Sequence, residues 1–167
     1  MFACAALAGL VTLAAAPSPM PPTKIHPPSA LVMVLGQLSE IATLAGLPEP
    51  VRNGTFVLPG GEKAGGWKLA TPGGAWNATD VIIDPSLPGR RMIFAACDAA
   101  ACVLHYERGG IAHMYYVMTF ARDAVGWKMT WLGVGHPAFA NYATLRAALA
   151  RGSAPYYFDD PDPRRDF

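Results

Sequence analysis

Charged residues are scarce in this sequence, and no region of it concentrates charge of one sign. Of its 167 residues only 15% are charged, 52% are hydrophobic, and the net charge is +1. Basic residues gather no further than the pairs Arg90-Arg91 and Arg164-Arg165, whereas a nucleic-acid-binding protein normally carries a basic stripe. The composition therefore predicts no nucleic-acid partner, and it excludes a disordered chain, which would be poor in hydrophobic residues.

The motifs that mark common enzyme classes are missing. The sequence contains no G-x-S-x-G, P-loop, G-x-G-x-x-G or H-E-x-x-H segment, and each of these motifs positions a nucleophile, a phosphate group or a zinc ion. Cys97, Cys102, His105 and His113 are candidate zinc ligands. Four residues separate the two cysteines, however, whereas structural zinc sites usually show C-x-x-C or H-x₃₋₅-H spacing. We expect no metal site, no cofactor and no catalytic residue.

No apolar run reaches the length of about 20 residues that a membrane-spanning helix requires. The uncharged segment 2–16 is shorter and rich in alanine, with an A-x-A pattern at its end, as is typical of the hydrophobic region of a signal peptide. We predict that residues 1–16 form a leader that is removed on export, which leaves a periplasmic or secreted protein without a membrane span. The alternative is a buried apolar segment of a cytosolic protein, because no Lys or Arg precedes the run.

Composition divides the rest of the chain into three parts. Residues 17–28 are rich in proline, which indicates an extended spacer without a core of its own. Residues 29–152 show helix and strand periods and form one predicted domain, in agreement with the chain length. Residues 153–167 form a polar, proline-rich tail of the kind that frays at the end of a domain.

The order of the periodic segments predicts an α+β fold. Apolar residues recur at helical spacing from Leu31 to Ala45, after Ser29 as a candidate N-cap and before Gly46 and Pro48 as stop signals. Residues 138–151 return to helical spacing after a series of β-branched and aromatic runs. These runs are 81–83, 91–96, 102–108, 111–121 and 126–134. We expect an antiparallel β-meander sheet that is packed by an N-terminal and a C-terminal helix.

Gly109-Gly110 predicts the register of the central hairpin. Two glycines between two strand runs favour a two-residue turn, which would place Arg108 opposite Ile111. Side chains alternate between the two faces of a strand, so the turn also predicts which residues share a face. One face would hold Leu104, Tyr106, His113, Tyr115 and Val117, and the other Val103, His105, Glu107, Met114, Tyr116 and Met118. The next strand would add Trp127, Met129 and Trp131 on a single face.

Two of the three cysteines stand close together in the predicted domain. Cys97 and Cys102 bracket a short loop between two strand runs, whereas Cys4 lies in the leader. In an oxidising compartment this pair is expected to form a disulfide, which stabilises the fold by only about 2 kcal/mol because the closed ring is small. Its predicted role is therefore to hold the loop in one shape for a partner.

The order of these features resembles the periplasmic inhibitors of vertebrate-type lysozyme, the Ivy family. The likeness rests on the export leader, the early helix, the C-x₄-C loop after a strand in residues 92–102, Trp131-Leu132-Gly133, Pro137 and a terminal helix with residues 145–149. The resemblance covers residues 29–152 and implies an antiparallel sheet with helices on one side. It also implies that the disulfide-closed loop plugs the cleft of a lysozyme. The family carries Lys, Pro, His and Asp in this loop, so Ala100 stands where the family has its histidine.

The first hypothesis is therefore an exported, non-catalytic binding module that presents a disulfide-closed loop. The resemblance makes a lysozyme or another cell-wall-degrading enzyme the expected partner. The predicted contacts are the loop residues and the residues taken to flank them, namely Asp98, Ala99, Ala100, Ala101, Arg91, His105 and Tyr106.

The second hypothesis belongs to a different class of protein. A helix on a curved antiparallel sheet can enclose a small-ligand pocket or a hydrolytic site, as in cystatin-like and NTF2-like folds. His105 and Glu107 lie two residues apart on one predicted face, where they could act as acid and base or form an ion pair. The pocket would be lined by His105, Glu107, His113 and Tyr115. A structural envelope protein without a small ligand is the third hypothesis.

Overall fold

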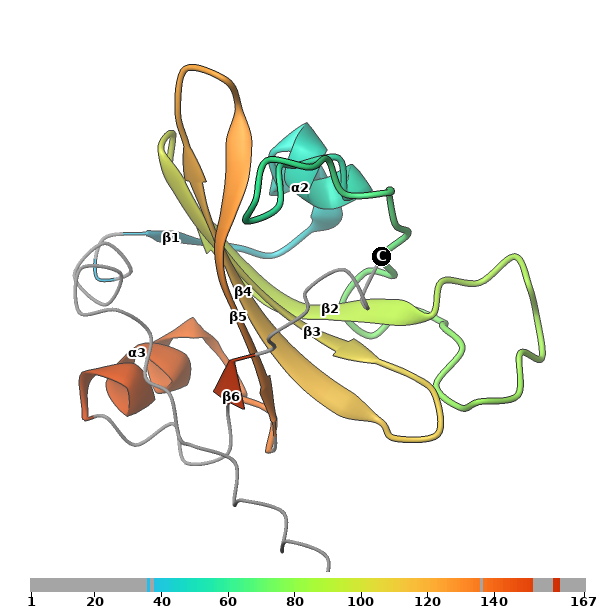
Figure 1. Cartoon of the computed structure of the whole chain (residues 1–167). Helices are drawn as coiled ribbons and strands as arrows, with labels where there is room; N and C mark the ends of the chain where they lie inside the picture. The colour runs from blue at the N-terminus through green and yellow to red at the C-terminus, as the bar shows by residue number, and fades with distance from the viewer. Residues whose placement is uncertain (1–35, 37, 136, 152–157, 160–167) are drawn as a thin grey trace, which may run out of the picture.

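The structure, a computed structural model, contains a twisted antiparallel sheet with helical segments on both sides (Figure 1). It describes residues 36, 38–135, 137–151 and 158–159, so the predicted leader, the spacer and most of the tail lie outside the described residues. The described strands are β1 (Ser39–Ile41), β2 (Arg90–Cys97), β3 (Ala101–Arg108), β4 (Met114–Arg122), β5 (Trp127–Gly135) and β6 (Phe158–Asp159). The described helices are the 3-10 turn η1 (Leu44–Gly46), α2 (Glu49–Asn53) and α3 (Tyr142–Ala150). None of them is long and apolar enough to cross a membrane.

The strands form one sheet in which neighbours in the sequence are also neighbours in space, in the order β1 to β6. Every neighbouring pair is antiparallel, so the predicted antiparallel meander and the α+β class are confirmed. Many residues of β2 to β5 are β-branched or aromatic, and such side chains pack well against one another on a pleated surface.

The segment before β2 adds backbone contacts at both outer edges of the long strands. Val57 donates its N–H to the Trp127 carbonyl and accepts the Met129 N–H beside β5. On the other side of the sheet, Ala70 exchanges hydrogen bonds with Arg90 and Met92 of β2. These contacts occupy backbone groups at the edges that would otherwise be open to pairing with another chain.

The N-terminal helix expected over residues 29–45 lies largely outside the described residues. Its described end forms the strand β1 and the 3-10 turn η1, and is not α-helical. The α-helix of this region is α2, which begins after Pro48. The predicted helix was expected to end before this proline. Pro50 fits its first turn, because a backbone N–H at this position would have no partner within the helix. Gly54 follows the last turn with a left-handed φ of 65°, which a glycine adopts at little cost.

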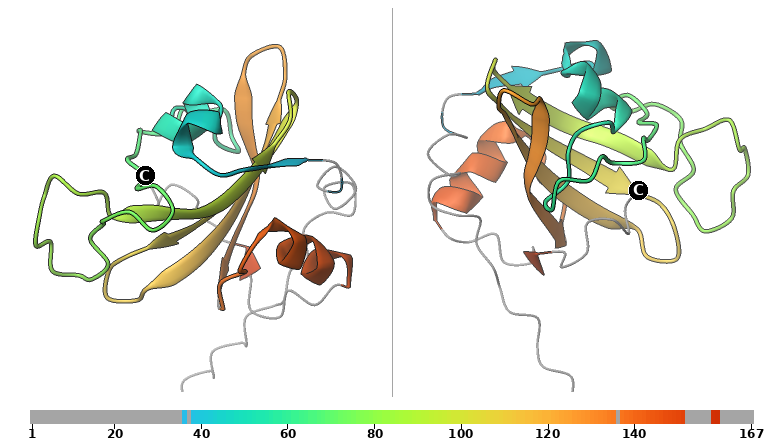
Figure 2. Two further views of the ribbon diagram at one scale, coloured as in Figure 1. Left: turned by 180° about the vertical axis from the view of Figure 1, so that it is seen from behind. Right: turned by 45° about the horizontal axis from the view of Figure 1, so that its top comes forward.

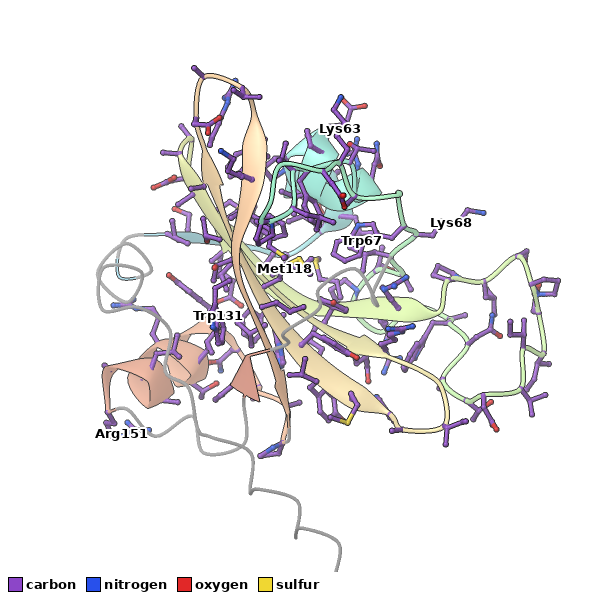
Figure 3. All side chains as sticks on the ribbon, viewed as in Figure 1. Lys63, Trp67, Lys68, Met118, Trp131 and Arg151 are labelled. Atoms are coloured by element: carbon purple, nitrogen blue, oxygen red, sulfur yellow. A yellow bond between two sulfur atoms is a disulfide. The ribbon has the colours of Figure 1, made fainter. Side chains whose placement is uncertain are left out.

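Both faces of the sheet are covered, one by α2 with the loop that follows it and the other by α3 (Figures 1 and 2). In Figure 3 Trp67 and Met118 lie in the layer on the α2 side, and Trp131 lies toward α3. The core on the α2 side contains, among others, Val51, Phe56, Leu104, Tyr106 and Phe120. The core on the α3 side contains Phe94, Val103, Val117, Tyr142 and Leu145. The described helices thus lie on opposite faces, whereas the resemblance implied one side.

The register of the β3–β4 hairpin differs from the prediction. Arg108 pairs with Met114, so the connection runs over residues 109–113 and is not a two-residue turn. Contacts with the preceding loop accompany this longer connection: the Gly109 N–H donates to the Gly89 carbonyl, and a side chain at position 109 would collide with the backbone of Asn77. The change exchanges the two faces of β4. Tyr116 and Met118 share a face with Leu104 and Tyr106, whereas Tyr115 and Val117 share a face with His105.

A β-bulge also separates the tryptophans of β5, which the alternating pattern had placed on one face. The register shifts between Thr119 and Phe120, which pair with Trp131 and Met129, so Thr130 is the additional residue on β5. As a result Met129 packs on the α2 side and Trp131 on the α3 side.

The packing of Trp131 on Gly133 gives a test of this arrangement. A Cβ atom at Gly133 would collide with the Trp131 ring, so we expect Gly133→Ala to lower the free energy of unfolding by roughly 1–3 kcal/mol, the usual cost of overpacking a core. Urea denaturation measures this difference. Gly65→Ala is the control, because a Cβ atom there meets nothing within 4 Å. Equal stability of the two variants would contradict the packing of the ring on the glycine.

Candidate functional site

The disulfide closes the end of the β2–β3 hairpin. Cys97 and Cys102 are register partners on the two strands, with a Cα–Cα distance of 4.1 Å, and their sulfur atoms are bonded. Both side chains belong to the core on the α2 side, so the disulfide attaches the loop to this core. The predicted disulfide is thus confirmed. We call residues 97–102 the hairpin tip.

The hairpin tip is held in one conformation by the Asp98 carboxylate. Its Oδ1 atom accepts hydrogen bonds from the N–H groups of Ala100 and Ala101, both at 2.7 Å, and the Asp98 N–H donates to the Ala101 carbonyl at 2.9 Å. Such a local side-chain bond to the backbone is a common way of fixing a turn. Asp98, Ala99 and Ala100 remain exposed, whereas Ala101 is buried. The tip therefore offers three residues to solvent on a fixed backbone.

The β4–β5 turn stands beside the hairpin tip and supports it. The Arg122 N–H donates to the Ala100 carbonyl at 2.7 Å, and the two hairpin ends project at the same end of the sheet (Figure 1). Asp123 shapes this turn by accepting the Val125 and Gly126 N–H groups. Its bond from the Lys128 ammonium group and these N–H groups hold the pKa of Asp123 below its usual value.

A hollow of about 520 Å³ opens beside the hairpin tip. It is bounded by the segment 46–50 before and within α2, by Asp98 and Ala99 of the tip, by Arg122, and by residues 126–127. Segment 46–50 and Arg122 carry no motif in the sequence, so they were not predicted as parts of this site. The order of the strands could have predicted one part of the site. Alternate turns of a meander lie at the same end of the sheet, so the 122–127 turn has to lie near the hairpin tip.

Three of the predicted contact residues do not belong to the hairpin tip. Arg91 lies six residues before Cys97 on β2, a distance of about 20 Å along a strand. Tyr106 is 0% exposed and stacks on Tyr116 with a centroid distance of 4.9 Å on the α2 side. His105 is 0% exposed as well. Neither of these two rings offers surface to a partner, so we correct the contact surface to the exposed tip and its neighbours.

His105 is a structural residue whose two ring nitrogens are both engaged. Nδ1 donates to the Tyr116 carbonyl at 2.7 Å, and Nε2 accepts the Phe139 N–H at 3.1 Å. This pattern requires the neutral ring with its proton on Nδ1, and protonation of Nε2 would turn two donors toward each other. Burial lowers the pKa of His105 from 6.5 to about 4, against the opposing effects of the Tyr116 carbonyl and the Glu107 charge.

The residues of the predicted pocket do lie together, at the opposite end of β3 from the tip. Glu107 accepts from Arg91 Nε at 2.6 Å through Oε1, and its Oε2 lies 2.7 Å from Nε2 of His113. The Trp76 ring packs against both partners of Glu107, with Arg91 at 5.2 Å and the His113 ring at 5.4 Å. The Tyr115 ring lies 5.1 Å from that of His113 and 6.3 Å from that of His105.

This cluster is a hydrogen-bonded network around one buried carboxylate, in which Arg91 forms an ion pair with Glu107. The Glu107 side chain is only 7% exposed, whereas those of Arg91 and His113 are 30% and 40% exposed. Both carboxylate oxygens are engaged, so the network ties the 109–113 connection and β2 to β3. No group of three or more His, Cys, Asp or Glu residues is placed to hold a metal ion in the part of the chain that the structure describes.

Comparisons of this chain with protein-family models, with curated proteins and with solved structures find no match.

The neutral state of His105 predicts how stability depends on pH. The folded protein holds this ring neutral down to a pH of about 4, whereas the unfolded chain takes up a proton below about 6.5. The neutral His105 ring therefore makes its full contribution to the free energy of unfolding above pH 6.5. This contribution, about 3 kcal/mol in total, is lost as the pH falls toward 4. Urea denaturation at a series of pH values measures it. His105→Gln removes the titrating group, and an unchanged slope in this variant would contradict the assignment.

Proposed function

We propose that the protein is a non-catalytic binding module that inserts its hairpin tip into a partner protein, and that the partner is a lysozyme or another cell-wall-degrading enzyme. The observation that carries the proposal is an exposed loop held at three places. The disulfide closes its base, the Asp98 carboxylate accepts hydrogen bonds from the backbone of the tip, and the Arg122 backbone N–H donates to the Ala100 carbonyl.

A loop fixed in this way binds at a lower cost in conformational entropy. Ordering of a flexible loop at an interface consumes part of the binding free energy, and a preformed tip avoids that loss. The disulfide is a small part of the stability of the whole domain, because its short ring contributes only about 2 kcal/mol. The restraints therefore favour presentation of the loop over stabilisation of the whole domain.

The chemistry of the hairpin tip defines what its partner would offer. Ala99 and Ala100 present methyl groups, which fit a narrow slot lined by apolar atoms. The carboxylate of Asp98 would be repelled by the catalytic carboxylates of a glycosidase. Arg122 is a cation of this surface and lines the hollow beside Asp98 and Ala99. We propose that Arg122 supplies the charge that attracts the enzyme's carboxylates, since Ala100 has no such group.

The proposed site of action is the periplasm or the outside of the cell. A disulfide persists in an oxidising compartment and is rare in the cytosol, and the Cys97–Cys102 bond is compatible with such a location. The predicted leader, residues 1–16, lies outside the described residues.

One observation favours the second candidate function, a small-ligand or hydrolytic site. Glu107, His113 and Tyr115 converge on one face, with the His113 side chain 40% exposed. Since His105 is sealed beneath Phe139, such a site would be limited to the outer three residues. His113→Ala separates the two candidates, because it removes a group of this cluster and leaves the tip, at the other end of β3, unchanged.

The tip hypothesis predicts the effect of enlarging an exposed alanine. Ala100→Tyr should leave the free energy of unfolding unchanged, because this side chain points to solvent, and should weaken enzyme binding by about 30-fold or more, as for a residue at the centre of an interface. Inhibition of animal-type and bacterial lytic enzymes and titration calorimetry measure the effect. Ala112→Tyr is the matched control, since Ala112 is exposed in the 109–113 connection, at the other end of β3 from the tip.

Reduction of the disulfide provides an independent arm of the same experiment. The oxidised protein should inhibit at least one of these enzymes, and the Cys97→Ser, Cys102→Ser double variant should inhibit it less because its tip is loosened. If no enzyme is bound at high excess of the oxidised protein, the proposal fails. Equal binding by Ala100→Tyr and the unaltered protein would place the contact surface elsewhere.

A further inference from the structure

The β4–β5 turn, residues 123–126, projects from the sheet beside the hairpin tip. In Figure 1 this turn, in orange, forms the upper end of the molecule. Neighbouring strands lie about 4.8 Å apart, so the centres of two consecutive hairpins are about 10 Å apart at their bases. The Arg122 N–H, at the end of β4, donates to the Ala100 carbonyl and so joins the turn to the tip. The two hairpin ends therefore form one continuous part of the surface.

The turn is held in one conformation by its own hydrogen bonds. The backbones of Asp123 and Gly126 exchange two hydrogen bonds, at 3.0 and 3.2 Å, and Gly126 has a φ of 137°, which a glycine adopts at little cost. The Asp123 carboxylate accepts the Val125 N–H at 2.8 Å through Oδ1 and the Lys128 ammonium group at 3.0 Å through Oδ2. The turn is thus fixed in the same way as the hairpin tip, where the Asp98 carboxylate accepts backbone N–H groups.

Val125 is a large apolar side chain in this turn, and it is 82% exposed. A single exposed aliphatic side chain is ordinary on a protein surface. Val125, however, stands on a fixed backbone at the end of the sheet that also exposes the methyl groups of Ala99 and Ala100. The charged groups nearest to it in the sequence, Asp123 and Lys128, form an ion pair, so their charges cancel. The turn therefore offers an uncharged apolar contact beside the tip.

The hollow beside the hairpin tip connects the tip to the β4–β5 turn. Its lining includes Ala99 of the tip, Gly126 of the turn and Trp127 at the start of β5. Leu47 and Pro48 bound it on the side of α2. The Trp127 and Leu47 side chains belong to the core beneath, so the hollow has a firm apolar base. A partner that covers the tip would therefore reach the turn over a continuous contact surface.

We propose that the β4–β5 turn is a second contact of the surface that binds the lytic enzyme, with Val125 packed against an apolar wall of the enzyme's cleft while the hairpin tip enters the cleft beside it. This inference rests on the proposed function. Two rigid projections about 10 Å apart at their bases need an elongated cleft and do not fit a pocket that holds only the end of a chain. An enzyme that cuts within a polysaccharide offers such a cleft, because parts of the chain remote from the broken bond also contribute binding.

Val125→Ser tests the second contact by titration calorimetry and by inhibition of the animal-type and bacterial lytic enzymes. The change removes apolar surface and keeps the backbone N–H of residue 125 that the Asp123 carboxylate accepts. The turn should therefore keep its shape, and the free energy of unfolding should stay unchanged. We expect the affinity for the enzyme to fall by about tenfold or more, because an aliphatic side chain is no longer removed from water on binding.

Ile111→Ser is the matched control for this variant. Ile111 is 95% exposed and lies in the 109–113 connection, at the other end of β3 from the tip. Its replacement also removes an exposed aliphatic side chain, and the affinity for the enzyme should stay within about twofold of that of the unaltered protein. Equal losses in Val125→Ser and Ile111→Ser would show a general effect of surface hydrophobicity and would overturn the second contact.

The unaltered protein and Ala100→Tyr separate the failure of this inference from the failure of the proposed function. If Ala100→Tyr weakens binding of the enzyme and Val125→Ser does not, the tip remains the contact and the second contact is wrong. If the unaltered protein binds no lytic enzyme, the proposed function fails and the second contact fails with it.

Methyl NMR spectroscopy of the unaltered protein gives a readout that needs no substitution. The methyl resonances of Val125 should shift or broaden when the enzyme is added, because the side chain becomes covered, whereas those of Ile111 should stay unchanged. Unchanged Val125 resonances at saturation with the enzyme would overturn the proposal.

Discussion

The pairing of β3 with β4, in which His105 stands opposite Val117, is the constraint on which the rest of the structure depends. Because side chains alternate along both strands, this register decides which residues meet α2 and which meet α3. A shift by one residue would turn the stacked rings of Tyr106 and Tyr116 out of register and move apolar side chains to the wrong layer. Only this register therefore directs the apolar side chains of both strands into the two cores, one on each face of the sheet.

His105 shows how a polar group is accommodated at the centre of this arrangement. An unpaired imidazole without solvent contact would cost several kcal/mol, but both ring nitrogens find backbone partners, one on β4 and one just before α3. The ring thus joins β3 to β4 and to the segment that leads into α3. A ring that makes both of these bonds has to remain neutral, so in the folded protein His105 is not available as an acid or a base.

Sequence patterns predicted the long strands β2 to β5, the disulfide and the C-terminal helix, because each depends on local periodicity or on residues close in the chain. They were wrong for residues 81–83, which were expected as a strand and lie in the loop before β2, and for β1, which lies where a helix was expected. The register failed where distant contacts decided it: Gly109-Gly110 favours a tight turn locally, but Gly109 packs on the backbone of Asn77. Trp131 was misplaced since a bulge leaves no trace in an alternating pattern. Arg91 was grouped with the tip by its nearness to Cys97 in the sequence, although a strand carries the two residues apart.

The meander separates the two candidate binding regions by its connectivity alone. Connections 98–100 and 123–126 must lie at one end of the strands, and connection 109–113 together with the start of β2 at the other. A strand of eight residues spans about 25 Å, so one small ligand cannot touch both ends. Any effect of one region on the other would have to pass through β2 and β3, whose close-packed side chains and paired backbones resist small displacements. The hairpin tip and the cluster around Glu107 are therefore independent in geometry, and a protein that uses both would hold two different ligands at opposite ends of one sheet.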